Sequence, residues 1–172
     1  MGLFDRFKSD QGQTMTPHLA FATCLIYVMA ADGEMDNEEV GHLLSVLGGA
    51  KDKSGGIGVG ANNRALLDQA LRIARTKPID HFLADATPML SDAQRMCILL
   101  NLIDSAMSDG EAEPEEQALI GRIQHAFGIT DQRFAPFFEV LMAKNDRTIF
   151  VDASHPHNAA DFRVELGMPA RN

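Results

Sequence analysis

Apolar residues recur along the chain at helical spacing, three or four positions apart. The pattern of residues 16–48 occurs again in residues 91–128. In each copy an apolar run precedes Asp-Gly, an acidic turn and then an amphipathic segment. Asp32 corresponds to Asp109, which follows 77 positions later, and Glu39 corresponds to Glu116 at the same offset. An internal repeat of this kind predicts a duplicated helix–acidic turn–helix unit.

The hydrophobic pattern predicts an all-α fold. Thr16 followed by Pro17 is typical of a helix start, and the apolar faces from Phe21 to Ala31 predict a buried helix. Ser91 and Gln94 have the spacing of a capping box, which predicts a second buried helix through Met107. We expect these two helices to cross at the centre of two pseudo-symmetric repeats. The remaining predicted helices cover residues 36–47, 63–75, 78–87, 114–127 and 130–144, and Gly128 ends the last but one.

The same pattern suggests how the chain is organised. We predict a flexible segment over 1–15, a helical domain over 16–144 and a tail over 145–172. Residues 148–151 of the tail are strand-like, and His155-Pro156-His157 is expected to break any helix. The glycine-rich stretch 48–60 contains a superficial dinucleotide fingerprint. It predicts a flexible loop, because a nucleotide site also requires alternating strands.

Charge is concentrated in two places. The chain has 172 residues, 45% hydrophobic residues and a net charge of −9. Windows 32–39 and 104–116 hold 11 of the 24 acidic residues and contain no Lys or Arg. The acidity is therefore local, which indicates specific sites. Nucleic-acid binding is not expected, because it requires a basic stripe.

The cysteines and the apolar runs indicate a cytoplasmic protein. Cys24 and Cys97 lie in apolar helical runs and are predicted to be reduced core residues, although the repeat places them close enough to pair. The longest apolar run, 19–31, is too short to span a bilayer. Residues 1–8 lack the apolar region of a signal peptide. We expect the chain to remain in the cytoplasm.

The two acidic turns are candidate metal sites. When Asp32 is aligned with position 5 of an EF-hand loop, Gly33 takes the glycine position and Glu39 the bidentate position 12. The first half of each loop is apolar and helical, so neither turn is an EF-hand. What remains is a set of oxygen ligands that suits Ca²⁺ first, and Mg²⁺ or Mn²⁺ as alternatives. The candidate ligands are Asp32, Glu34, Asp36, Glu39, Asp109, Glu111, Glu113 and Glu116.

Other interpretations of these residues stay open. Asp36 and Glu39 have capping-box spacing, and acidic residues favour a helix N-terminus, so the turns are also compatible with a metal-free acidic scaffold that docks a basic partner. His155 and His157 are a further pair of metal-ligand types on an extended segment. A hydrolytic enzyme is the third reading, but no pattern for a triad or a small-molecule substrate is present, and we do not expect an enzyme.

The duplicated Ala-Asp-Gly or Ser-Asp-Gly turn, followed six residues after the glycine by Glu, resembles the TerB family of tellurite resistance proteins. It is also similar to the N-terminal domain of DjlA-type membrane co-chaperones. The resemblance covers residues 17–138 and implies about seven helices with pseudo-twofold symmetry. It further implies a divalent-metal-binding surface and a cytoplasmic role in stress or tellurite resistance, with protein partners in complexes near the inner face of the membrane. The residues that carry the resemblance are Asp32, Gly33, Glu39, Asp109, Gly110 and Glu116.

Overall fold

The computed structural model of the chain describes residues 15–31, 62–107 and 114–163. Six α-helices and three short 3-10 turns occupy these residues, and no strand occurs among them. The elements are α1 Pro17–Met29, α3 Asn62–Thr76, α4 Ile79–Ala86, η2 Thr87–Met89, α5 Asp92–Ala106, α6 Pro114–Ala126, α7 Asp131–Asn145, η3 Arg147–Phe150 and η4 Pro156–Asn158. The predicted all-α class is confirmed. The helix predicted over 36–47 lies outside the described residues.

Several helix boundaries follow from local side-chain chemistry. The hydroxyl of Thr16 accepts a hydrogen bond from the backbone N–H of Leu19 at 3.2 Å and thereby caps α1. Ser91 and Gln94 exchange the two hydrogen bonds of a capping box at the start of α5. Gly128 adopts a φ of +68° just after α6, a conformation that favours glycine. These three predicted boundaries are confirmed.

Helix α1 is the most buried element of the described structure. It packs against α3, α4, α5 and α6, and most of its side chains are buried. The buried hydroxyl of Thr23 is satisfied within the helix, because it donates to the carbonyl of Leu19 at 2.6 Å. Tyr27 packs against the ring of Phe82 and donates its hydroxyl to the carbonyl of Lys77 at 2.5 Å. Burial raises the pKa of Tyr27 to about 12.

Helix α5 packs against α1, α6 and α7 but leaves one face to solvent. Cys97 lies on this face and is exposed, so its predicted place in the core is wrong. The physical reason is that α1, α6 and α7 pack on the other faces of α5, and the solvent face also carries Asn101, whose amide donates to the carbonyl of Cys97 at 2.8 Å. Cys24, by contrast, is fully buried in α1, and both thiols are free.

Helices α5 and α7 run in the same direction, and polar contacts link them at both ends. At the first end, the guanidinium of Arg133 forms a two-pronged ion pair with the carboxylate of Asp92. At the other end, the Asp104 carboxylate accepts from Lys144 Nζ at 2.5 Å and from the Asn145 amide at 3.0 Å. The two sets of contacts fix the register between the helices.

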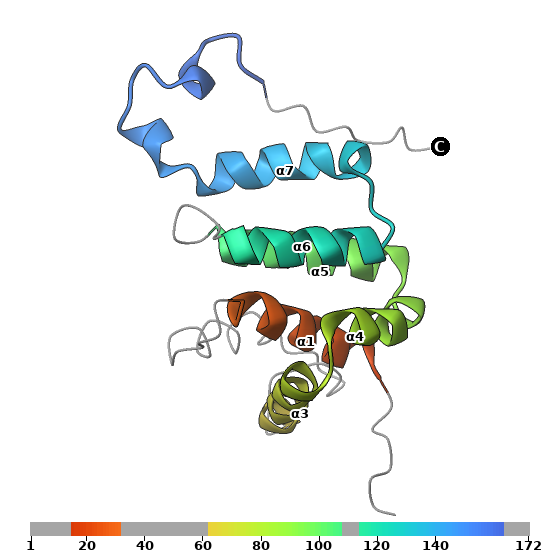
Figure 1. Cartoon of the computed structure of the whole chain (residues 1–172). Helices are drawn as coiled ribbons and strands as arrows, with labels where there is room; N and C mark the ends of the chain where they lie inside the picture. Colours follow the sequence, from red (N-terminus) through yellow and green to blue (C-terminus); the bar gives the residue numbers. More distant parts are fainter. Residues whose placement is uncertain (1–14, 32–61, 108–113, 164–172) are drawn as a thin grey trace, which may run out of the picture.

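Four helix termini lie at the same end of the molecule, on the left in Figure 1. Helices α1, α5 and α7 finish there, at Met29, Ala106 and Asn145, and α6 begins there at Pro114. We call this end of the helical body the turn end. The pseudo-symmetric packing of the repeats and the predicted domain boundaries stay predictions, because much of the first repeat lies outside the described residues.

The chain beyond α7 corrects two predictions. The strand expected over 148–151 is wrong, because Arg147–Phe150 forms a 3-10 turn. The carboxylate of Asp146 accepts from the backbone N–H of Thr148 at 2.9 Å and bends the chain. Residues 155–157 are not extended either, since Pro156–Asn158 forms a second 3-10 turn. We call residues 146–163 the C-terminal segment.

Candidate metal centre

The eight predicted metal ligands are almost all outside the described residues. Glu116 is described: it lies in the first turn of α6 and is half-buried. The other seven, which the structure does not describe, are Asp32, Glu34, Asp36, Glu39, Asp109, Glu111 and Glu113. The predicted acidic site therefore remains a prediction, and the described helices supply only its frame.

The two helices that precede the acidic turns end on the same side of the molecule. Residues 32 and 108 directly follow described residues at the ends of α1 and α5, and both of these helices end at the turn end. Within the second acidic window, Asp104 is paired with Lys144 of α7. The sequence window contains no basic residue, but the fold brings one to it from forty residues away.

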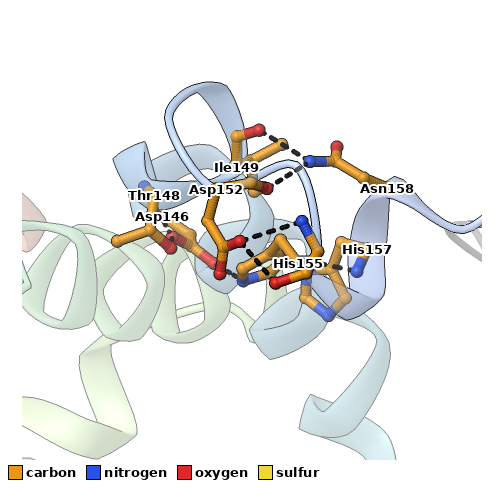
Figure 2. A network of polar contacts seen from close by, with 8 residues as sticks. Asp146, Thr148, Ile149, Asp152, His155, His157 and Asn158 are labelled. Atoms are coloured by element: carbon orange, nitrogen blue, oxygen red, sulfur yellow. Dashed lines mark hydrogen bonds and ion pairs between the residues drawn. The ribbon is translucent and has the colours of Figure 1, made fainter.

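A different group of metal-ligand types comes together in the C-terminal segment. Oxygen and nitrogen atoms of Asp146, His155 and His157 lie within 4.8 Å of one another (Figure 2). Asp146 is the capping residue directly after α7, and the two histidines flank Pro156 at the start of η4. All three side chains are partly buried, with 21% of the Asp146 side chain and 16% of the His155 side chain exposed.

The two oxygens of Asp146 have different partners. Oδ1 accepts from the backbone N–H of Thr148 at 2.9 Å and from its hydroxyl at 2.5 Å. Oδ2 lies 2.9 Å from Nε2 of His155. The hydroxyl of Thr148 is the main cause that holds the pKa of Asp146 below its ordinary value, and the nearby rings of His155 and His157 lower it further. Asp146 is thus ionised at neutral pH.

The two imidazoles are positioned by hydrogen bonding and ring contacts. The backbone N–H of His157 donates to Nδ1 of His155 at 3.1 Å. The two rings meet edge to face with centroids 4.9 Å apart, and the ring of His157 stacks on Phe162 at 4.3 Å. Nδ1 of His157 is buried and has no hydrogen-bond partner in the described part of the chain.

A second carboxylate supports the turn that carries the histidines. Asp152 Oδ1 accepts from the backbone N–H of Ser154 at 2.9 Å and from its hydroxyl at 2.6 Å, and these bonds lower the pKa of Asp152. The amide of Asn158 donates to the carbonyls of Ile149 and Asp152 (Figure 2). These bonds tie η3 to η4 and hold the histidines over Asp146.

Sequence reasoning identified His155 and His157 as metal-ligand types but did not include Asp146. Asp146 stands nine residues before His155, beyond the end of a helix, and no motif links the two positions. An aspartate directly after a helix and two residues before Thr is the available signal, because that spacing is typical of a side-chain turn. Such a turn folds the chain back, which is how the histidines reach the carboxylate.

Comparison with known proteins concerns the helical body. The model of a family described as Tellurite resistance protein TerB matches residues 18–137. The matched range begins in α1 and ends within α7, so it does not include the C-terminal segment. No curated protein and no solved structure matches the chain. Among the described helices, none is both long and apolar enough to cross a membrane.

Proposed function

The chain belongs to the TerB family of tellurite resistance proteins, and from this premise we propose that it is a divalent-metal-binding module of a stress response. The proposed ligands are carboxylates of the two acidic turns, with Asp32 and Asp109 as their equivalent first residues. Carboxylate oxygens favour hard cations, so Ca²⁺ is the first choice and Mg²⁺ or Mn²⁺ the alternatives.

The observation that carries the proposal is the arrangement of the flanking helices. Both helices that lead into the acidic turns finish at the turn end, and α6 begins there, which favours a common face for the two turns. Carboxylates gathered on one face repel one another, and a divalent cation relieves that repulsion. Among the eight proposed ligands, Glu116 is the one that lies within the described residues, where it is half-buried in the first turn of α6.

We propose that the cation-bound face acts through protein partners and not through catalysis. Binding of a cation would change the charge of this face and therefore the partner that it fits. The proposed setting is the cytoplasm, at the inner face of the membrane, in a complex that responds to tellurite or a related stress.

A metal-free scaffold is the second candidate function, and one contact favours it. Asp104, in the second acidic window, is neutralised by Lys144 of the same chain. A basic partner could neutralise the remaining carboxylates of the turns in the same way, without a cation. Binding of such a partner would weaken with added salt and would not respond to a chelator.

Thermal unfolding of the chelator-treated protein tests the first candidate. Cation at about 100 times its dissociation constant should add about 2.7 kcal/mol to the free energy of unfolding. We expect the midpoint to rise with one of Ca²⁺, Mg²⁺ or Mn²⁺ at fixed ionic strength. Asp32→Ala or Asp109→Ala should abolish this rise without unfolding the domain.

Asp68→Ala is the matched control, because Asp68 is an exposed carboxylate on α3 whose position in the sequence lies outside both acidic windows. It should respond to the cation as the wild type does. If the two turn variants also respond as the wild type does, the metal proposal is wrong. If no cation shifts the wild type, the scaffold is favoured and its partner should be captured only at low salt.

A further inference from the structure

We propose that Asp146, His155 and His157 form a separate site for a borderline transition metal, with Zn²⁺ as the first choice. The site lies in the C-terminal segment, outside the range that matches the family. It differs in chemistry from the acidic turns, because two of its three ligands are imidazoles. Imidazole nitrogen suits Zn²⁺, Ni²⁺ or Cu²⁺, whereas Ca²⁺ and Mg²⁺ favour oxygen.

The distances fit one metal ion. Ligand atoms at about 2.0–2.2 Å from a tetrahedral zinc stand roughly 3.3 Å apart. Asp146 Oδ2 and His155 Nε2 are already 2.9 Å apart, and the whole group of ligand atoms spans at most 4.8 Å. The three ligand atoms are therefore close enough to share one ion, with the fourth position left to water.

Metal binding must displace one proton of His155 and open one hydrogen bond. His155 Nδ1 accepts a backbone N–H, so in the neutral ring the proton resides on Nε2 and faces the Asp146 carboxylate. Metal binding at Nε2 moves that proton to Nδ1, and the 3.1 Å hydrogen bond from the His157 N–H opens. One neutral hydrogen bond is a small loss beside the free energy of a zinc site.

His157 has a ring nitrogen that the fold leaves without a partner. Nδ1 is buried and makes no hydrogen bond within the described residues, which is costly for a polar atom. The stack on Phe162 fixes the plane of the ring without using its nitrogens. The ring is therefore held in place by an apolar contact, and its nitrogens stay available for a metal.

The segment holds its shape without an apolar core of its own. Neither η3 nor η4 contains a buried residue, and Phe150 and Val151 are 90% and 84% exposed. Hydrogen bonds among Asp146, Asp152 and Asn158 order the turns but bury no apolar surface. A bound metal would cross-link the end of α7 to η4, and so would fix the segment beside the turn end.

Titration of the full chain with Zn²⁺ against a chromophoric chelator tests the site. The decisive variant is His157→Phe, which keeps an aromatic ring for the stack on Phe162 and removes the nitrogen ligands. The second is Asp146→Asn, which keeps an oxygen to cap Thr148 and removes the charge. We expect each to weaken Zn²⁺ binding by at least ~10-fold, the smaller loss seen when supporting residues of metal sites are changed.

His81→Phe is the matched control, because His81 is exposed on α4, outside this cluster. It should bind Zn²⁺ as the wild type does. The variants Asp32→Ala and Asp109→Ala should also bind Zn²⁺ at this site as the wild type does. That result would distinguish the site from the acidic turns. If His157→Phe and Asp146→Asn bind Zn²⁺ as tightly as the wild type, the proposal is overturned.

A spectroscopic measurement locates the bound ion directly. Nitrogen NMR of the histidine rings should show Zn²⁺ shifting the signals of His155 and His157, and the backbone amide of His157 should shift as its hydrogen bond opens. The signal of His81 should not move. Zn²⁺ binding that leaves the His155 and His157 signals unchanged would place the ion elsewhere and would also overturn the proposal.

Discussion

The helical body and the C-terminal segment are built on opposite principles. In the body, α1 and α5 pack with α3, α4, α6 and α7 around buried apolar side chains, and polar groups cap or link helices at the edges. In the segment, carboxylates bend the chain, and large apolar residues such as Phe150 face solvent. The body is therefore stabilised mainly by the burial of apolar side chains, whereas a few hydrogen bonds and ion pairs set the shape of the segment.

The largest expected effect contrasts two phenylalanines. Phe82 in α4 is fully buried, and Phe150 in η3 is 90% exposed. Phe82→Ala should lower the free energy of unfolding by about 3–5 kcal/mol, because it removes a buried ring and leaves a cavity. Phe150→Ala should change it by less than about 0.5 kcal/mol. Chemical denaturation of both variants measures the difference, and equal losses would break the contrast between the two regions.

A smaller effect separates the turns of the two regions. Gly128 has a φ of +68° and open space around its Cβ position, so Gly128→Ala should cost about 1–2 kcal/mol through backbone conformation alone. Asp152→Ala should leave global unfolding within about 0.5 kcal/mol, because Asp152 orders only its own turn.

Gly121→Ala is the control for the glycine. Gly121 lies inside α6, also with open space, and the substitution should stabilise the helix by up to about 1 kcal/mol. Hydrogen exchange should then locate the effect of Asp152→Ala in the C-terminal segment. Slower unfolding of the whole protein in the Gly128 variant would contradict the prediction.

The smallest expected effect concerns the loss of stability at low pH. The hydrogen bond from Arg133 holds the pKa of Asp92 below its ordinary 3.8. A lowered pKa in the folded state stabilises the protein above that ordinary value, and the contribution is lost as the pH falls through the folded pKa. Unfolding midpoints of wild type and Arg133→Gln should therefore differ at neutral pH and converge in acid.

The matching change in the C-terminal segment is Thr148→Val. The hydroxyl of Thr148 lowers the pKa of Asp146, just as Arg133 lowers that of Asp92. Because the segment contributes little buried surface, Thr148→Val should leave the global pH profile of unfolding unchanged. A shifted global profile would show that the segment unfolds together with the body.

Much of the helical body could be predicted from the sequence because its signals are local. Thr16, Ser91 and Gly128 each mark a boundary through their own side chain or backbone, and the structure confirms all three. Cys97 was placed wrongly, because an apolar run does not state which face of α5 meets its neighbours. That choice depends on where α1, α6 and α7 pack, which is not a local property.

The candidate sites were less predictable for two reasons. The β-branched and aromatic residues 148–151 favour a strand, but the hydrogen bond from the Thr148 N–H to the Asp146 carboxylate favours a turn, and Phe150 and Val151 are left exposed. Asp146 meets His155 only because two successive turns fold the chain back, so sequence spacing gave no ligand motif. The proposed carboxylate ligands of the acidic turns, Glu116 apart, lie outside the described residues and remain predicted from their repeat.

The unlike positions of the two thiols have a consequence for covalent chemistry. Burial raises the pKa of Cys24, so its nucleophilic thiolate is scarce, and no electrophile reaches it without unfolding. Cys97 is exposed on α5 and accessible to alkylating or oxidising reagents. The native chain thus carries one accessible thiol and one that becomes accessible on unfolding. A single dye or spin label can be attached to α5 without first engineering away a second cysteine.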